Sequence, residues 1–92
     1  MGLDFTGKRV IVCGGSRGIG RAIAHGFAVG GAAVSICARG SATLEATREE
    51  LAALGHPTHA GACDLADAAA IARYITEAAA ALGGIDVLVN NA

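Results

Sequence analysis

Four glycines within seven residues stand between a short apolar run and a segment with helical apolar periodicity. The apolar run covers residues 10–13, and the glycines are Gly14, Gly15, Gly18 and Gly20. A strand, a glycine-rich turn and a helix N-terminus together form an anion site, because free backbone N–H groups and the positive end of the helix dipole face the ligand. The sequence therefore predicts a phosphate-binding loop at residues 14–20.

The spacing of the glycines distinguishes between the known phosphate loops. A P-loop requires GxxxxGK[ST], but the frame that starts at Gly15 lacks both the lysine and the following hydroxyl. The GxGxxG pattern is also broken, because Ile23 stands where its third glycine belongs. The remaining pattern is GxxxGxG, formed by Gly14, Gly18 and Gly20, which suits a turn that lets the backbone approach a pyrophosphate.

The charges around the loop favour one class of dinucleotide. An NAD site usually has an acidic residue near the end of the second strand, but no acid occurs between Asp4 and Glu45. The chain instead offers Ser16 and Arg17 in the loop and Arg39 further on. Guanidinium groups bind phosphate in a bidentate manner. We therefore predict that the cofactor is NADP(H), held through its 2′-phosphate, with NAD(H) as the alternative.

Seven elements are expected to position these residues. Apolar, β-branched runs predict strands at 8–13, 33–38, 58–63 and 85–90. Apolar residues at helical spacing predict helices from about 18 to 29, after Ser41 to about 54, and after Asp64 to about 82. Ser41 is the expected N-cap of the second helix, on which Leu44, Leu51 and Leu54 share a face.

The order of these elements predicts the fold. Short connections imply parallel strands in a β-α-β-α-β-α-β chain. Right-handed crossovers and a third crossover that returns beside the first strand give the strand order 3-2-1-4, with helices on both faces. The expected fold class is α/β, a three-layer, doubly wound parallel sheet of Rossmann type within one domain over residues 1–92. The glycine loop then lies at the topological switch point.

The loop GGSRGIGRAIA resembles the cofactor loop of the short-chain dehydrogenase/reductase family. Three further stretches match the family in order and spacing: ICAR ending the second strand, CDLAD after the third, and IDVLVNNA on the fourth. The resemblance covers essentially the whole chain. It implies reversible hydride transfer between a nicotinamide cofactor and a carbonyl or alcohol. It also implies that these residues are the N-terminal part of a Rossmann domain that is incomplete here.

The resemblance also implies which residues contact the cofactor. In the family the glycines and Ile19 shape the loop, and the Asp64–Leu65 pair lies against the adenine. The final Asn-Asn-Ala matches a motif that steadies the central sheet and borders the adenosine ribose. With the charge argument, the predicted cofactor-binding residues are Gly14, Ser16, Arg17, Gly18, Ile19, Gly20, Arg39, Asp64, Leu65, Asn90, Asn91 and Ala92.

The catalytic groups of the family are a Ser, a Tyr, a Lys and a supporting Asn, all of which follow the fourth strand. The single tyrosine here, Tyr74, is expected in the third helix and the single lysine, Lys8, at the first strand, so no catalytic residue is assigned. We expect an NADP-dependent oxidoreductase whose dinucleotide-binding half is this chain, inactive by itself. The alternative is a dinucleotide-binding fragment without catalysis. The resemblance further implies a small carbonyl or alcohol substrate and a homo-oligomeric complete protein.

Composition addresses the other classes of function. Cys13, Cys37 and Cys63 are too widely spaced for a zinc or disulfide framework, and each ends an expected strand, so we predict buried thiols and no metal site. Cys13 stands where the family usually has threonine, which puts in doubt the usual tie between the first and fourth strands. The sequence lacks a basic, aromatic nucleic-acid surface, a secretory signal and a membrane-spanning run. A cytoplasmic location is expected.

Overall fold

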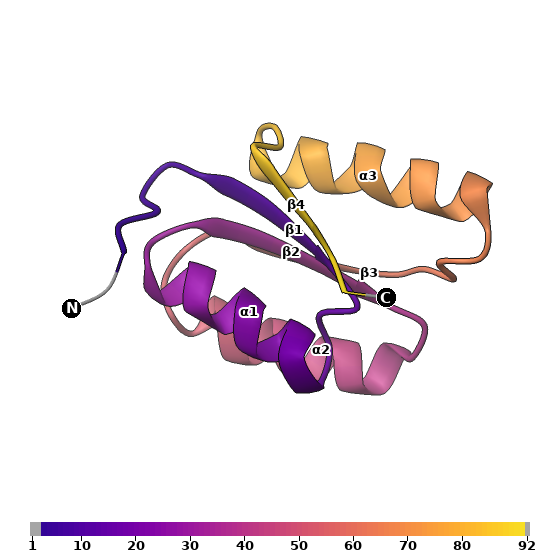
Figure 1. Ribbon diagram of the computed structural model, residues 1–92, viewed down its shortest axis with the longest axis horizontal. Helices are drawn as coiled ribbons and strands as arrows, with labels where there is room; N and C mark the ends of the chain where they lie inside the picture. The colour runs from indigo at the N-terminus through magenta and orange to yellow at the C-terminus, as the bar shows by residue number, and fades with distance from the viewer. Residues whose placement is uncertain (1–2, 92) are drawn as a thin grey trace.

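A computed structural model describes residues 3–91, except for the side chain of Ser41, and consists of a parallel sheet between two layers of helices (Figure 1). The strands are β1 (Arg9–Cys13), β2 (Ala33–Ala38), β3 (Thr58–Ala62) and β4 (Val87–Asn90). The helices are α1 (Gly18–Val29), α2 (Ser41–Ala52) and α3 (Ala68–Leu82). The sheet order is β3-β2-β1-β4, which confirms the predicted α/β class and the order 3-2-1-4.

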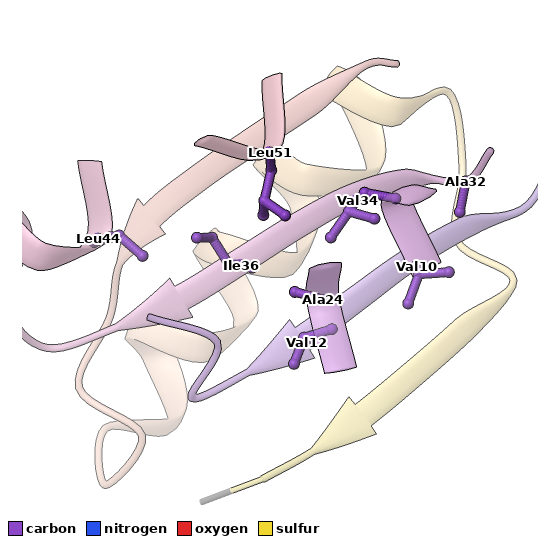
Figure 2. Close-up of a cluster of buried hydrophobic side chains, with 9 residues drawn as sticks. Val10, Val12, Ala24, Ala32, Val34, Ile36, Leu44 and Leu51 are labelled. Carbon is purple, nitrogen blue, oxygen red and sulfur yellow. The ribbon is translucent and has the colours of Figure 1, made fainter. Parts of the chain in front are cut away.

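The two central strands are buried on both faces, because α1 and α2 cover one side of the sheet and α3 covers the other (Figure 1). The first side is aliphatic, and Figure 2 shows its packed side chains: Val10, Val12, Ala24, Val34, Ile36, Leu44 and Leu51. The second side carries Ile11, the three cysteines and Tyr74. Fully burying one such aliphatic side chain contributes about 1.5–3 kcal/mol, so the aliphatic layer is the main stabilising contact of α1 and α2.

The second helix differs from the sequence prediction at both ends. It begins at Ser41 with Gly40 in the N-cap position, so the prediction of Ser41 as N-cap is wrong. Leu54 lies beyond the helix and is 36% exposed, so it does not continue the buried face of Leu44 and Leu51. The helix ends before Leu54 because the chain turns there toward Gly55, whose φ of +93° favours glycine.

The third helix begins later than expected. Its N-cap is Asp67, whose Oδ1 accepts hydrogen bonds from the backbone N–H groups of Ala69 and Ala70. Asp64 instead accepts from the N–H of Ala66 within the preceding turn. An N-capping carboxylate satisfies first-turn N–H groups that have no partner inside the helix, so it fixes where α3 starts.

β4 forms one edge of the described sheet. It pairs only with β1 among residues 3–91, and its Leu88 is 57% exposed. An ion pair holds the approach to this strand: Arg9 Nε donates to Asp86 Oδ2 over 2.9 Å, and the hydrogen bond lowers the pKa of Asp86. Exposed apolar edge strands tend to pair with another strand.

None of the helices in the described part of the chain has the length and apolar character needed to span a membrane.

Candidate functional site

The predicted cofactor residues gather beside the C-terminal ends of the parallel strands (Figure 1). The glycine loop follows β1, Arg39 follows β2, the Asp64–Leu65 pair comes just after β3, and Asn91 follows β4. β1 lies between β2 and β4, and the helices that follow β1 and β3 cover opposite faces. The loop therefore occupies the switch point where open α/β sheets bind ligands. Ala92, also predicted, lies outside the described residues.

Glycine is required at several points of the loop by its geometry. Gly14 and Gly18 have φ values of +80° and +62°, which L side chains rarely adopt. The backbone N–H groups of Gly14 and Gly15 both donate to the carbonyl of Cys37, over 2.8 and 3.3 Å. A Cβ on Gly15 would lie 2.6 Å from Ile36 Cγ2, whereas a Cβ on Gly18 would meet nothing within 4 Å. The loop thus lies against the end of β2 and leaves open space beside Gly18.

The start of α1 packs directly against the loop. A Cβ on Gly20 would lie 2.0 Å from the carbonyl oxygen of Gly14 and 2.8 Å from Asn91 Nδ2. The backbone N–H of Asn91 donates to the Cys13 carbonyl over 3.0 Å, which joins β4 to β1 at this end of the strands. The link between these strands is therefore a backbone contact, while the side chain of Cys13 packs on the α3 side.

The loop offers free donors and positive charge. Within residues 3–91, the backbone N–H groups of Ser16, Arg17 and Gly18 donate no hydrogen bond to a protein acceptor. The first turn of α1 contains no acidic residue, and both Arg17 and Arg39 are exposed. The helix dipole adds positive potential at this end of α1. These features suit an anionic ligand such as a pyrophosphate.

A groove of about 400 Å³ separates the loop from α2, and Ser16, Arg17, Thr43 and Thr47 are among the residues that line it. Inside it, Thr47 Oγ1 donates to the Ser16 carbonyl over 3.0 Å. Thr47 is not among the residues predicted from the sequence. Its signal was the spacing, because Thr47 lies three residues after Leu44 and four before Leu51, on the buried face of the helix.

An ion pair links the two helices beside this groove. Arg21 Nε of α1 donates to Glu50 Oε2 of α2 over 2.9 Å. This hydrogen bond lowers the pKa of Glu50. Both side chains remain about half exposed, at 50% and 42%. Exposed pairs contribute little to stability, so the pair orients the groove wall more than it holds the fold.

A second buried polar cluster, also missed, lies under α3. Ser35 Oγ of β2 is within hydrogen-bond distance of His59 Nδ1, at 2.8 Å, and of the Tyr74 hydroxyl, at 2.5 Å. Ser35 and His59 are paired directly in the sheet, and Gly61 leaves room for the Tyr74 ring, since a Cβ there would lie 2.7 Å from Tyr74 Cδ1. Burial raises the pKa of Tyr74. Tyr74 is therefore a buried, protonated hydrogen-bond partner.

The three cysteines are buried, as predicted. Cys13, Cys37 and Cys63 have exposed fractions of 7%, 0% and 4%, and Cys13 is paired with Cys37 in the sheet. Burial, together with the neighbouring Cys13, raises the pKa of Cys37 to about 12. Among the side chains that the structure describes, no cluster of three or more His, Cys, Asp or Glu is arranged to hold a metal ion.

These thiols are expected to be inert in the folded protein. A thiol reagent should label them about 100-fold more slowly than in urea, because reaction requires opening of the sheet and formation of a thiolate. The measurement is the rate of thiol labelling followed by absorbance, with and without urea. Labelling of Cys37 in the native protein at the rate seen in urea would contradict the buried, protonated state described above.

Comparison with known proteins gives one consistent result. The short chain dehydrogenase family model matches residues 8–92. An uncharacterized oxidoreductase of Mycobacterium tuberculosis is 42% identical over 84 residues, which are 91% of this chain and 32% of that protein. A short chain dehydrogenase of Burkholderia cenocepacia, solved in complex with NADP, is 45% identical with a TM-score of 0.91, over 96% of this chain and 36% of that one.

A third similar protein also has a solved structure. The RhlG protein of Pseudomonas aeruginosa, solved as an active-site complex with NADP, is 38% identical with a TM-score of 0.87. The match covers 98% of this chain and 36% of that one. The chain thus spans about a third of the length of these relatives.

Proposed function

The chain belongs to the short-chain dehydrogenase family, and from that premise we propose that it is the dinucleotide-binding part of an NADP(H)-dependent oxidoreductase. The reaction is hydride transfer between the nicotinamide and a carbonyl or alcohol of a small molecule. The observation that carries the proposal is the glycine loop at the switch point, with free N–H groups on Ser16, Arg17 and Gly18 and no acid in the first helical turn.

The residues present fit a dinucleotide. The backbone beside Gly18 has open space where a Cβ would point, so phosphate oxygens have access to the loop amides. The helix dipole of α1 supplies positive potential for the pyrophosphate, and the side chain of Arg17 supplies positive charge for the 2′-phosphate. Leu65, half-buried beyond β3, offers an apolar contact for the adenine. Asn90 ends β4 and Asn91 follows it, at the position expected to border the ribose. When bound, the nicotinamide supplies or accepts the hydride.

The preference for NADP(H) is supported by the end of β2. The strand ends at Ala38 and is followed by the exposed Arg39, with no carboxylate to accept from the ribose hydroxyls. Ser16 lines the groove next to Arg17, so a hydroxyl and a guanidinium stand on the same side of the loop. The relatives from Burkholderia cenocepacia and Pseudomonas aeruginosa were both solved with NADP, which supports the same assignment.

The Arg39→Ala variant tests this preference. Hydrogen bonds to charged groups contribute about 1.5–3 kcal/mol, so NADPH binding should weaken by about 10- to 100-fold. NADH binding should change by less than about twofold, since NADH has no 2′-phosphate for the guanidinium. The dissociation constants are measured in the complete protein by the fluorescence of the reduced nicotinamide.

Arg73→Ala is the matched control, because Arg73 is an exposed arginine on α3, on the opposite side of the sheet. It should leave both dissociation constants unchanged. Equal weakening of NADPH and NADH binding by Arg39→Ala would exclude a 2′-phosphate contact. Failure of the unmodified protein to bind either cofactor would exclude the proposed function altogether.

We place the proton-transfer groups of the reaction outside these residues. Tyr74 is 3% exposed and hydrogen-bonded beneath α3. Lys8 comes just before β1, and the glycine loop comes just after it, so the two lie at opposite ends of this strand. The lengths of the relatives, of which the chain spans about a third, are consistent with further residues supplying the chemistry.

A further inference from the structure

We propose that Thr47 of α2 is a positioning residue that orients the Ser16–Arg17 peptide and thereby sets the discrimination between NADP(H) and NAD(H). The inference rests on the proposed function, because it assigns Ser16 and Arg17 to the cofactor. Thr47 would not touch the cofactor itself. It would act through the loop.

The contact is buried and specific. Thr47 and Ser16 have exposed fractions of 3% and 6%, and Thr47 Oγ1 donates to the Ser16 carbonyl oxygen over 3.0 Å. Thr47 lies between Leu44 and Leu51 on the face of α2 that packs into the aliphatic core, where those two leucines are 4% and 1% exposed. The hydroxyl therefore projects from a fixed base toward the loop.

The bond constrains more than one atom of the loop. The peptide between Ser16 and Arg17 is planar and trans, so its carbonyl and N–H point in opposite directions. Once the Ser16 carbonyl is directed at α2, the N–H of Arg17 is directed away from α2. That N–H donates no hydrogen bond to an acceptor within residues 3–91, and it is one of the free donors of the anion site. The side chains of Ser16 and Arg17 leave from the two ends of the same plane.

The two sides of the loop are held by different elements. Gly14 and Gly15 are anchored by their N–H groups on the Cys37 carbonyl at the end of β2. The next residue, Ser16, is held by α2 through Thr47. Loss of the Thr47 hydroxyl leaves a buried carbonyl without a partner, which favours rotation of the peptide toward solvent. Such a rotation displaces Ser16 and Arg17 together.

The test compares the isosteric Thr47→Val with Thr47→Ser in the complete protein. We expect Thr47→Val to raise the dissociation constant of NADPH by about tenfold, and that of NADH by less than about threefold. NADPH would lose the contacts of its 2′-phosphate with the side chains of Ser16 and Arg17, whereas NADH would lose only the contact of its pyrophosphate with the Arg17 N–H. Thr47→Ser keeps the donor and should bind both cofactors within about twofold of the unmodified protein. The dissociation constants come from nicotinamide fluorescence.

Thr76→Val serves as the control, because Thr76 Oγ1 also donates to a backbone carbonyl, that of Ala72, over 3.0 Å, but on α3. It should change neither constant. If Thr47→Val fails to fold, Thr47→Cys replaces it, since a thiol is a weaker donor than the hydroxyl kept in Thr47→Ser. The expected order of NADPH affinity is then Ser above Cys.

The outcomes separate the two proposals. Unmodified protein that binds neither cofactor refutes the proposed function and this inference together. Unmodified protein that binds NADPH, with Thr47→Val binding it equally well, refutes only the positioning role of Thr47. Equal weakening of NADPH and NADH binding by Thr47→Val refutes the role in discrimination, because a general loosening of the loop would affect both cofactors.

Discussion

Replacing Gly20 by alanine is expected to lower the free energy of unfolding by about 3 kcal/mol or more and to abolish dinucleotide binding. The added Cβ would lie 2.0 Å from the Gly14 carbonyl oxygen and 2.8 Å from Asn91 Nδ2. The Gly14 oxygen belongs to a loop that is anchored on Cys37, so it cannot move without disturbing the cofactor site. Urea unfolding followed by circular dichroism measures the first effect, and an NADPH titration measures the second.

Gly26→Ala on the same helix is the matched control. A Cβ on Gly26 would meet nothing within 4 Å, and the residue has an ordinary helical backbone. Alanine should therefore raise the free energy of unfolding by about 0.5–1 kcal/mol through its higher helix propensity. If Gly20→Ala unfolds at the same urea concentration as the unmodified protein, the close packing of α1 against the loop is refuted.

Replacing Ser35 by alanine is expected to be nearly as damaging, although the change removes a single oxygen atom. The Ser35 hydroxyl joins His59 Nδ1 and the Tyr74 hydroxyl, and Tyr74 is 3% exposed. A buried polar group left without a partner costs about 1–3 kcal/mol. We expect a loss of that size in the free energy of unfolding, measured by urea unfolding. NADPH binding should stay within about twofold, because the cluster lies under α3 and away from the glycine loop.

A double-mutant cycle with Tyr74→Phe separates this network from simple packing. Removing both hydroxyls leaves no unpaired oxygen on either residue, so the double variant should lose less free energy of unfolding than the sum of the single losses. The expected coupling is about 0.5–3 kcal/mol. Strictly additive losses would show that the Ser35 and Tyr74 hydroxyls do not stabilise each other.

The helices and strands predicted best from the sequence were those with a clear local pattern of apolar residues. α1 and β2 have the predicted bounds, because a periodic apolar face and a continuous apolar run are both closed by glycines or by a change of polarity. The glycine spacing likewise predicted a tight turn after the first strand, and the structure has that turn between β1 and α1. The start of α3 was misplaced because Asp64 and Asp67 both make capping-like turns, and only Asp67 binds the helical N–H groups.

The three polar contacts that were not predicted depend on packing between distant segments. Ser35 appears in the sequence as one polar residue inside an apolar strand, and its partners lie 24 and 39 residues away. His59 and Tyr74 reach Ser35 only because of the register of β2 with β3 and the packing of α3 against the sheet. Thr47 meets Ser16 across 31 residues for the same reason. Such contacts become predictable only when the register and the helix placement are known.

The central position of β1 has a consequence for the synthesis of the protein. β1 is the first of the four strands to be translated, but its partner β4 follows it by 77 residues, the separation of the paired Val10 and Val87. At about 5–20 residues per second, a ribosome needs roughly 4–15 seconds to deliver that partner. During this interval one side of a buried central strand has no neighbour, so the emerging chain is most exposed to wrong pairing before β4 arrives.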